Sequence, residues 1–126
     1  MGSCKKRGGT VLSYDLRIAV KVDGTNIFAK IAEPEHCNPT YNLADMFRAC
    51  TGWDYNQSQY YRCVDVLPLI DHGIRELTIN PDKYRKYNPP NGWGNLDSLK
   101  TALESLRQCI YETAEDIPVE HLWVAW

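Results

Sequence analysis

The alternation of apolar and polar residues near the start of the chain predicts a β-hairpin. Apolar residues occupy every second position from Leu12 to Val22, a period of two that is typical of a strand with one buried face. The pair Asp23-Gly24 follows and favours a tight hairpin turn, because both positions tolerate positive φ. The return strand is predicted over residues 26–31, where one face carries Ile27, Ala29 and Ile31.

Two helices are predicted in the middle of the chain. The first covers residues 43–50, because Asn42 suits an N-cap and Gly52 suits a helix end. The second starts at Cys63, after which apolar residues return every three or four positions and so share one helix face. That face carries Cys63, Val66, Leu67, Ile70, Ile74 and Leu77. Gly73 is expected to weaken this helix by up to about 1 kcal/mol relative to alanine.

The clearest helical pattern lies in the last third of the chain. Asn95 is its expected N-cap, and an apolar stripe with steps of three and four follows: Leu96, Leu99, Leu103, Leu106 and Ile110. Between the two long helices, Asn80-Pro81 ends the earlier one, and residues 81–86 are predicted to form one further turn with Pro81 at its first position. Residues 88–94 are rich in proline and glycine and are predicted to form a loop.

A final strand completes the predicted fold. Residues 121–126 place Leu122, Val124 and Trp126 on one face and Trp123 on the other. We predict an α+β fold with a small antiparallel sheet, made of the N-terminal hairpin and the C-terminal strand and covered on one face by two to three helices. The C-terminal strand is expected to pair with the first strand, since a hairpin alone is marginally stable. Residues 1–10 are predicted to be a flexible tail, and residues 11–126 a single domain.

Composition narrows the class of protein. The 126 residues are 44% hydrophobic and 24% charged, which are the proportions of a globular domain. The formal net charge of −2 disfavours a protein coated in positive charge, so nucleic acid is not an expected partner. No apolar run reaches the roughly 18 residues that a membrane span needs, and no membrane association is expected. An exposed edge of so small a sheet could pair with another chain, which predicts a homo-oligomer.

The five cysteines show no metal-binding or disulfide pattern. Their number is odd and no two form a C-x-x-C pair, so we expect reduced thiols in a cytoplasmic protein. No metal site, cofactor or catalytic residue is predicted, because the ligand spacings, phosphate-binding loops and nucleophile motifs that announce them are absent from the sequence. A pairing of Cys37 with His72 or His121 remains an alternative, and it would make the protein a cysteine-dependent hydrolase or transferase.

Aromatic and amide residues concentrate in four predicted loop segments, over residues 38–42, 52–56, 60–61 and 88–95. Tyrosine and tryptophan offer rigid surfaces with a polar tip, and asparagine offers adaptable hydrogen bonds. Such loops suit a protein partner, or a stacked nucleotide or sugar, although each aromatic residue could instead pack into the core. The candidate binding residues are Tyr41, Trp53, Tyr55, Asn91 and Trp93. The basic and aromatic residues 83–87 suit single-stranded nucleic acid or, alternatively, a solvated helix face.

The order of these motifs resembles small uncharacterised proteins of bacteriophages and other bacterial mobile elements. The resemblance runs from residue 38 to residue 110 and rests on Asn38-Pro39-Thr40-Tyr41-Asn42 and Asn91-Gly92-Trp93-Gly94. It implies a bacterial or phage cytosolic origin and carries no catalytic residue. We therefore expect a non-enzymatic accessory protein that binds a protein partner through its loops. The alternatives are a protein that binds a nucleotide-like or sugar-like small molecule, and the cysteine-dependent enzyme.

Overall fold

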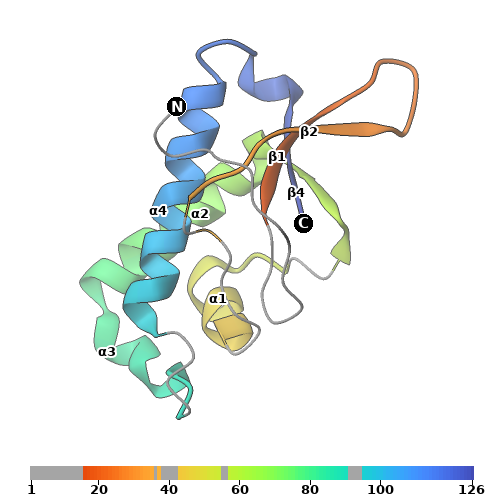
Figure 1. Cartoon of the computed structure of the whole chain (residues 1–126). Coiled ribbons are helices and arrows are strands. Elements are labelled where there is room, and N and C mark those ends of the chain that lie inside the picture. Colours follow the sequence, from red (N-terminus) through yellow and green to blue (C-terminus); the bar gives the residue numbers. More distant parts are fainter. Residues whose placement is uncertain (1–15, 36, 38–42, 55–56, 91–94) are drawn as a thin grey trace.

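The computed structural model describes residues 16–35, 37, 43–54, 57–90 and 95–126, and it shows an α+β fold (Figure 1). A four-stranded sheet lies beside a layer of helices. The strands are β1 (Arg17–Lys21), β2 (Phe28–Ala32), β3 (Tyr60–Arg62) and β4 (Leu122–Ala125). The helices are α1 (Ala44–Thr51), α2 (Cys63–Ile79), α3 (Pro81–Tyr84) and α4 (Leu96–Thr113), with 3-10 turns η3 (Arg85–Tyr87) and η4 (Val119–His121).

The sheet has the order β2-β1-β4-β3, and each neighbouring pair of strands is antiparallel. The predicted hairpin and the pairing of the C-terminal strand with the first strand are confirmed. Gly24 at the hairpin turn has φ of 73°, which glycine adopts without steric cost. Strand β3 was not predicted, because its three residues are too few to show an alternation. This strand is formed by its pairing with β4.

The predicted helices are confirmed within a few residues of their expected bounds. The Asn95 side chain accepts a hydrogen bond of 2.9 Å from the Ser98 backbone N–H and so caps α4. Gly52, at the end of α1, has φ of 73° as a left-handed C-cap. The expected cap Asn42 and the predicted tail over residues 1–10 lie outside the described residues.

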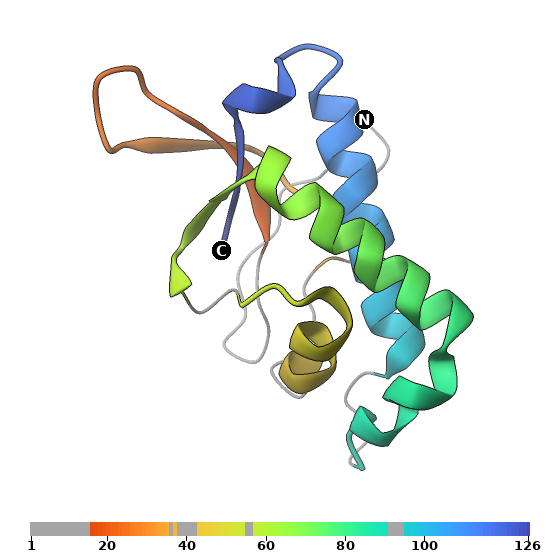
Figure 2. The same cartoon turned by 180° about the vertical axis from the view of Figure 1, so that it is seen from behind.

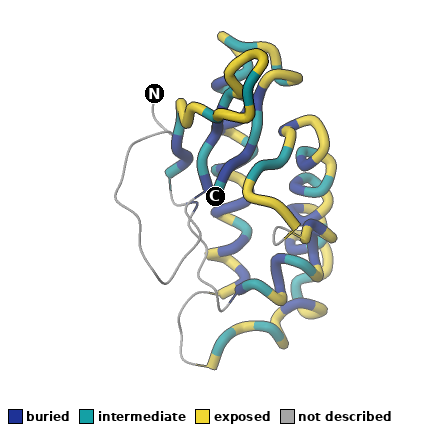
Figure 3. The backbone as a smooth tube through the Cα atoms, turned by 90° about the vertical axis from the view of Figure 1, so that its right-hand side faces the viewer, coloured by how far each residue is buried: buried dark blue, intermediate teal, exposed yellow. Residues whose placement is uncertain are grey.

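The core lies between one face of the sheet and the two long helices. Figure 2 shows α2 and α4 side by side, and α2 packs against β3 and β4. Ile18, Leu122 and Val124 point from the sheet into this core and are fully buried. Along both helices, buried and exposed residues alternate in short stretches (Figure 3), as expected for helices with one face on the core.

The expectation that the whole apolar face of the hairpin is buried is wrong for β2. Ile27 is 63% exposed and Ile31 is 41% exposed. The hairpin projects beyond the layer of helices (Figure 1), so none of the described helices covers this part of the sheet. The register between β1 and β2 also shifts between Ile18 and Ala19, which leaves Ile31 without a directly opposite residue. A period of two indicates a strand, but burial depends on what packs over it.

Gly73 allows α1 to approach α2 closely. A Cβ atom on Gly73 would lie 2.6 Å from Thr51 Cγ2 and 3.2 Å from Leu103 Cδ1. Gly73 is therefore expected to lower the intrinsic stability of α2, but it also allows Thr51 and Leu103 to pack closely against this helix. Helices α1, α2 and α4 meet at the one position on α2 that carries no side chain.

Candidate functional site

The face of the sheet turned away from α2 and α4, here called the outer face, carries aromatic and basic side chains. Directly opposed residues of neighbouring antiparallel strands share a face. Ala19 of β1 lies opposite Lys30 of β2 on one side and Trp123 of β4 on the other. Trp123 in turn lies opposite Arg62 of β3. One row across the four strands, the outer-face row, therefore reads Lys30, Ala19, Trp123, Arg62.

Two further rings join Trp123 on the outer face. Phe28 and Tyr60 stand two positions from Lys30 and Arg62, so their side chains point to the same side. The Phe28 and Tyr60 rings are stacked, with centroids 3.8 Å apart and planes inclined by 8°. The Phe28 and Trp123 rings meet edge to face at 5.0 Å. All three side chains are half-buried, so each keeps part of its ring surface exposed.

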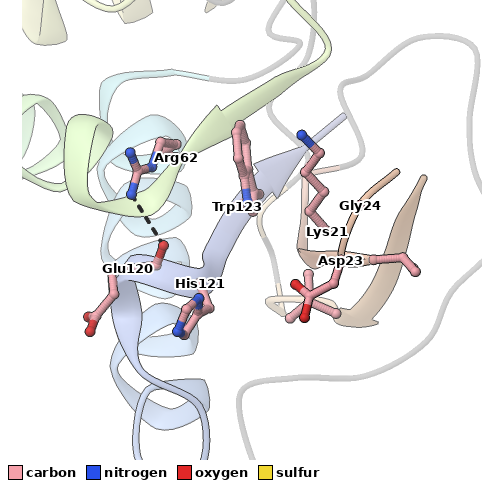
Figure 4. Close-up of a pocket in the computed structure, with 9 residues that line it drawn as sticks. Lys21, Asp23, Gly24, Arg62, Glu120, His121 and Trp123 are labelled. Atoms are coloured by element: carbon pink, nitrogen blue, oxygen red, sulfur yellow. Dashed lines mark hydrogen bonds between the residues drawn. The ribbon is translucent and has the colours of Figure 1, made fainter. Parts of the chain in front are cut away.

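An open groove of about 610 Å³ lies at the end of the sheet where the hairpin projects. In Figure 4, Arg62 and Glu120 lie on one side of the groove, Lys21 and Asp23 on the other, and Trp123 and His121 between them. Arg62 Nη2 donates a hydrogen bond of 3.4 Å to the Glu120 backbone oxygen. This contact holds the guanidinium at the wall of the groove.

The groove combines one aromatic surface with charges of both signs. Lys21 and Arg62 are exposed and can bind an anion. Among the described residues, no ion pair involves Lys21, Lys30 or Arg62. The carboxylates of Asp23 and Glu120 can accept hydrogen bonds from amino or hydroxyl groups. The Trp123 ring offers a surface for a planar group, so the arrangement suits an aromatic ligand that carries a negative charge.

The structure places Trp53 in the core and describes none of the other predicted binding residues. Trp53 is 2% exposed, and its ring lies 5.4 Å from Phe47 and 5.3 Å from Tyr61. Its indole N–H has no acceptor among the described residues. It joins α1 to β3 rather than lining the groove. Tyr41, Tyr55, Asn91 and Trp93 lie outside the described residues.

The described thiols of Cys37, Cys50 and Cys63 are buried, and Cys37 is the cysteine on which the enzyme alternative depends. Cys37 is buried, and burial raises the pKa of its thiol well above the ordinary value. Burial likewise raises the pKa values of Cys50 and Cys63 to about 12. These three thiols are free and stay protonated at neutral pH, whereas the thiolate is the nucleophilic form. Cys109 is disulfide-bonded, so the expectation that every thiol is reduced is wrong at that position.

The basic residues over 83–87 belong partly to the core of the helical layer. Tyr84 is buried, and its hydroxyl donates a hydrogen bond of 2.5 Å to Glu76 Oε1. Lys83 Nζ lies 3.8 Å from the same carboxylate oxygen, and Lys86 Nζ lies 5.3 Å from the centre of the Tyr87 ring. In the described part of the chain, no group of three His, Cys, Asp or Glu side chains could hold a metal ion.

The groove residues carried a weak signal in the sequence. The alternation in β4 puts Trp123 on the opposite face from Leu122 and Val124, and Lys21 lies opposite to the apolar face of β1 in the same way. That pattern identifies outward-facing residues of single strands. It does not show which strands are neighbours, and the site exists only because β4 lies between β1 and β3.

No family model, curated protein or solved structure matches this chain. Within the described residues, no helix has the length and apolar character needed to cross a membrane.

Proposed function

We propose that this protein acts by binding a small aromatic anion of the nucleotide class in the groove beside Trp123. The observation that carries the proposal is the position of Trp123 next to Arg62 in the outer-face row, with Lys21 across the same groove. A base stacked on an aromatic side chain contributes about 1–3 kcal/mol, and hydrogen bonds between a cation and a phosphate are among the strongest in proteins. The volume of about 610 Å³ falls in the usual range for small-molecule sites.

A protein partner is the second candidate, and one observation favours it. Val22, Ile27 and Ile31 are exposed apolar side chains of the projecting hairpin, and exposed apolar surface of this kind often marks a binding surface. With this second candidate we also propose that the protein is a homo-oligomer, that it is cytoplasmic, and that it comes from a phage or mobile element. These proposals rest on the sequence resemblance and on the two open edges of the described sheet, β2 and β3.

Isothermal titration calorimetry with AMP, GMP, CMP, UMP, adenosine and inorganic phosphate tests the groove. We expect nucleotides to bind more tightly than either adenosine or phosphate alone, because base and phosphate each contribute. Arg62→Gln should weaken nucleotide binding by about 10-fold and leave adenosine binding unchanged. Trp123→Leu should weaken both. Arg48→Gln, which changes a cation on α1 paired with Asp45, is the matched control and should change neither.

Circular dichroism and thermal unfolding of each variant separate a lost contact from a lost fold. Two results would contradict the proposal. One is that no nucleotide binds at millimolar concentration. The other is that nucleotides bind equally well to the wild-type protein and to folded Arg62→Gln and Trp123→Leu variants.

A further inference from the structure

We infer that the ligand of the outer face is a single-stranded nucleic acid, of which the groove holds one nucleotide. This inference rests on the proposed function, and it goes beyond it by naming a ligand that extends past the groove. Its basis is that further aromatic and basic side chains lie on the outer face beyond the end of the groove. Lys30, Phe28 and Tyr60 lie on the outer face without lining the groove.

The three rings form a continuous aromatic surface. Phe28 stacks on Tyr60 and meets Trp123 edge to face, so the three rings form one cluster that offers to a ligand the ring surface left exposed by these mutual contacts. A mononucleotide on Trp123 covers only one end of this surface. In one common RNA-binding module, aromatic side chains on a four-stranded sheet stack two or three successive bases. Stacking is tolerant of sequence, because every base has a flat face to offer.

The cations of the outer face are placed to follow a phosphate backbone. Lys30 and Arg62 occupy the two ends of the outer-face row. Lys21 adds a third exposed cation beside the groove. Among acidic residues near this face, Glu33 is buried and lies 4.0 Å from Arg17 Nε. Asp23 and Glu120 lie at the groove itself.

The net charge of −2 disfavoured nucleic acid when the sequence was considered as a whole. That argument concerns a protein with positive charge spread over its surface. It does not apply to three cations gathered on one face. With about three phosphate contacts, log K should fall with log salt concentration with a slope of about −2, since each contact to a single strand contributes about 0.7.

An unpaired strand is required because stacking on Trp123, Phe28 and Tyr60 needs exposed base faces. In a duplex these faces are hidden between neighbouring base pairs. We therefore expect a fluorescein-labelled dodecamer of single-stranded DNA or RNA to bind the full chain at least 10-fold more tightly than the corresponding mononucleotide. The same strand annealed to its complement should bind more weakly than the free strand in fluorescence anisotropy.

Variants outside the groove test the extension separately from the groove. Lys30→Gln should reduce the salt slope by about 0.7 and lower dodecamer affinity, while mononucleotide affinity stays unchanged. Tyr60→Leu should lower dodecamer affinity, and Tyr60→Phe should retain it because the ring remains. The matched control is Lys86→Gln, which removes an exposed cation from the basic residues of η3 and should have no effect.

The outcomes distinguish this inference from the proposed function. If mononucleotides bind in the groove but dodecamers bind no more tightly, the inference is overturned and the proposed function stands. If neither ligand binds, both are overturned. A loss of dodecamer binding with Lys86→Gln but not with Lys30→Gln would also overturn the inference, because the strand would then lie on the helical layer. Tighter binding of the duplex than of the single strand would also overturn the inference.

Discussion

Replacing Gly73 with alanine tests how tightly the three helices pack. Two effects oppose each other. Alanine is favoured over glycine within a helix by about 1 kcal/mol, so an isolated α2 would gain stability. In the folded protein, however, the new methyl group would lie 2.6 Å from Thr51 Cγ2 and 3.2 Å from Leu103 Cδ1. The first of these distances is too short for two carbon atoms in contact, so the neighbouring side chains must move.

Thr51 cannot move without loss. It is buried, and its hydroxyl donates a hydrogen bond of 2.6 Å to the Phe47 backbone oxygen. Thr51 Oγ1 also accepts a hydrogen bond of 2.9 Å from the Trp53 backbone N–H. Overpacking of a core costs about 1–3 kcal/mol, and each disturbed hydrogen bond adds about 1 kcal/mol. With one disturbed hydrogen bond, and after the helix-propensity gain is subtracted, we expect Gly73→Ala to destabilise the protein by about 1–3 kcal/mol. The melting temperature should fall by roughly 4–11 °C.

Urea and thermal unfolding followed by circular dichroism measure this change. The matched variant is Thr51→Ser, which removes Cγ2 and keeps the hydroxyl with both of its hydrogen bonds. Alone it should cost about 1 kcal/mol, the value of a buried methyl group. Combined with Gly73→Ala it should restore most of the lost stability, because the new methyl group fills the space that Cγ2 vacates. The double-mutant cycle should therefore show a coupling of about 1–2 kcal/mol.

A higher free energy of unfolding for Gly73→Ala would refute this reasoning, because helix propensity would then outweigh the contact between α1 and α2. Additive effects of the two substitutions would refute it as well. In that case the destabilisation would not arise from the approach of the new methyl group to Thr51.

Three further predictions concern stability and reactivity. Asn95→Ala should lower the free energy of unfolding by about 1 kcal/mol through loss of the helix cap, as measured by urea unfolding; no change would exclude the cap. Tyr84→Phe should flatten the acid dependence of stability. The Tyr84 hydroxyl holds the pKa of Glu76 below its ordinary value, so the stability that this contact provides is present above about pH 4.3 and is lost as the pH falls through the folded-state pKa. The prediction is contradicted if the free energy of unfolding falls by the same amount in wild type and variant as the pH is lowered. A thiol reagent at pH 8 should modify Cys37, Cys50 and Cys63 far more slowly in the folded protein than in urea, because the folded-state thiols are buried and protonated. Equal rates would show that burial does not protect them.

The elements that could be predicted from the sequence are those encoded by neighbouring residues. The hairpin turn at Asp23-Gly24 and the N-cap at Asn95 are local chemical signals, and both were found. The long helices followed from the spacing of their apolar residues. Strand β3 has no such local signal, because its three residues become a strand only by pairing with β4.

Burial and site geometry were harder to predict, because they depend on contacts between distant parts of the chain. Ile27 and Ile31 have the pattern of a buried face, yet no helix reaches them. Trp53 looks like a loop residue in the sequence, but it packs between Phe47 and Tyr61. The candidate groove takes its residues from strands whose order in the sheet no local pattern specifies.

The central position of β4 has a consequence for how the sheet is completed during synthesis. Among the described strands, β1 and β3 are joined only through β4, which lies more than 100 positions further along the chain than β1. Long-range pairings of this kind form slowly, because the entropy of closing the chain must be overcome first. The hairpin and the helices are at most marginally stable before the sheet is completed, and Arg62 and Lys21 are brought to either side of Trp123 only when β4 inserts. The groove to which we assign the proposed function therefore arises in the same step that joins β1 to β3, and a chain synthesised only as far as β3 has no assembled groove.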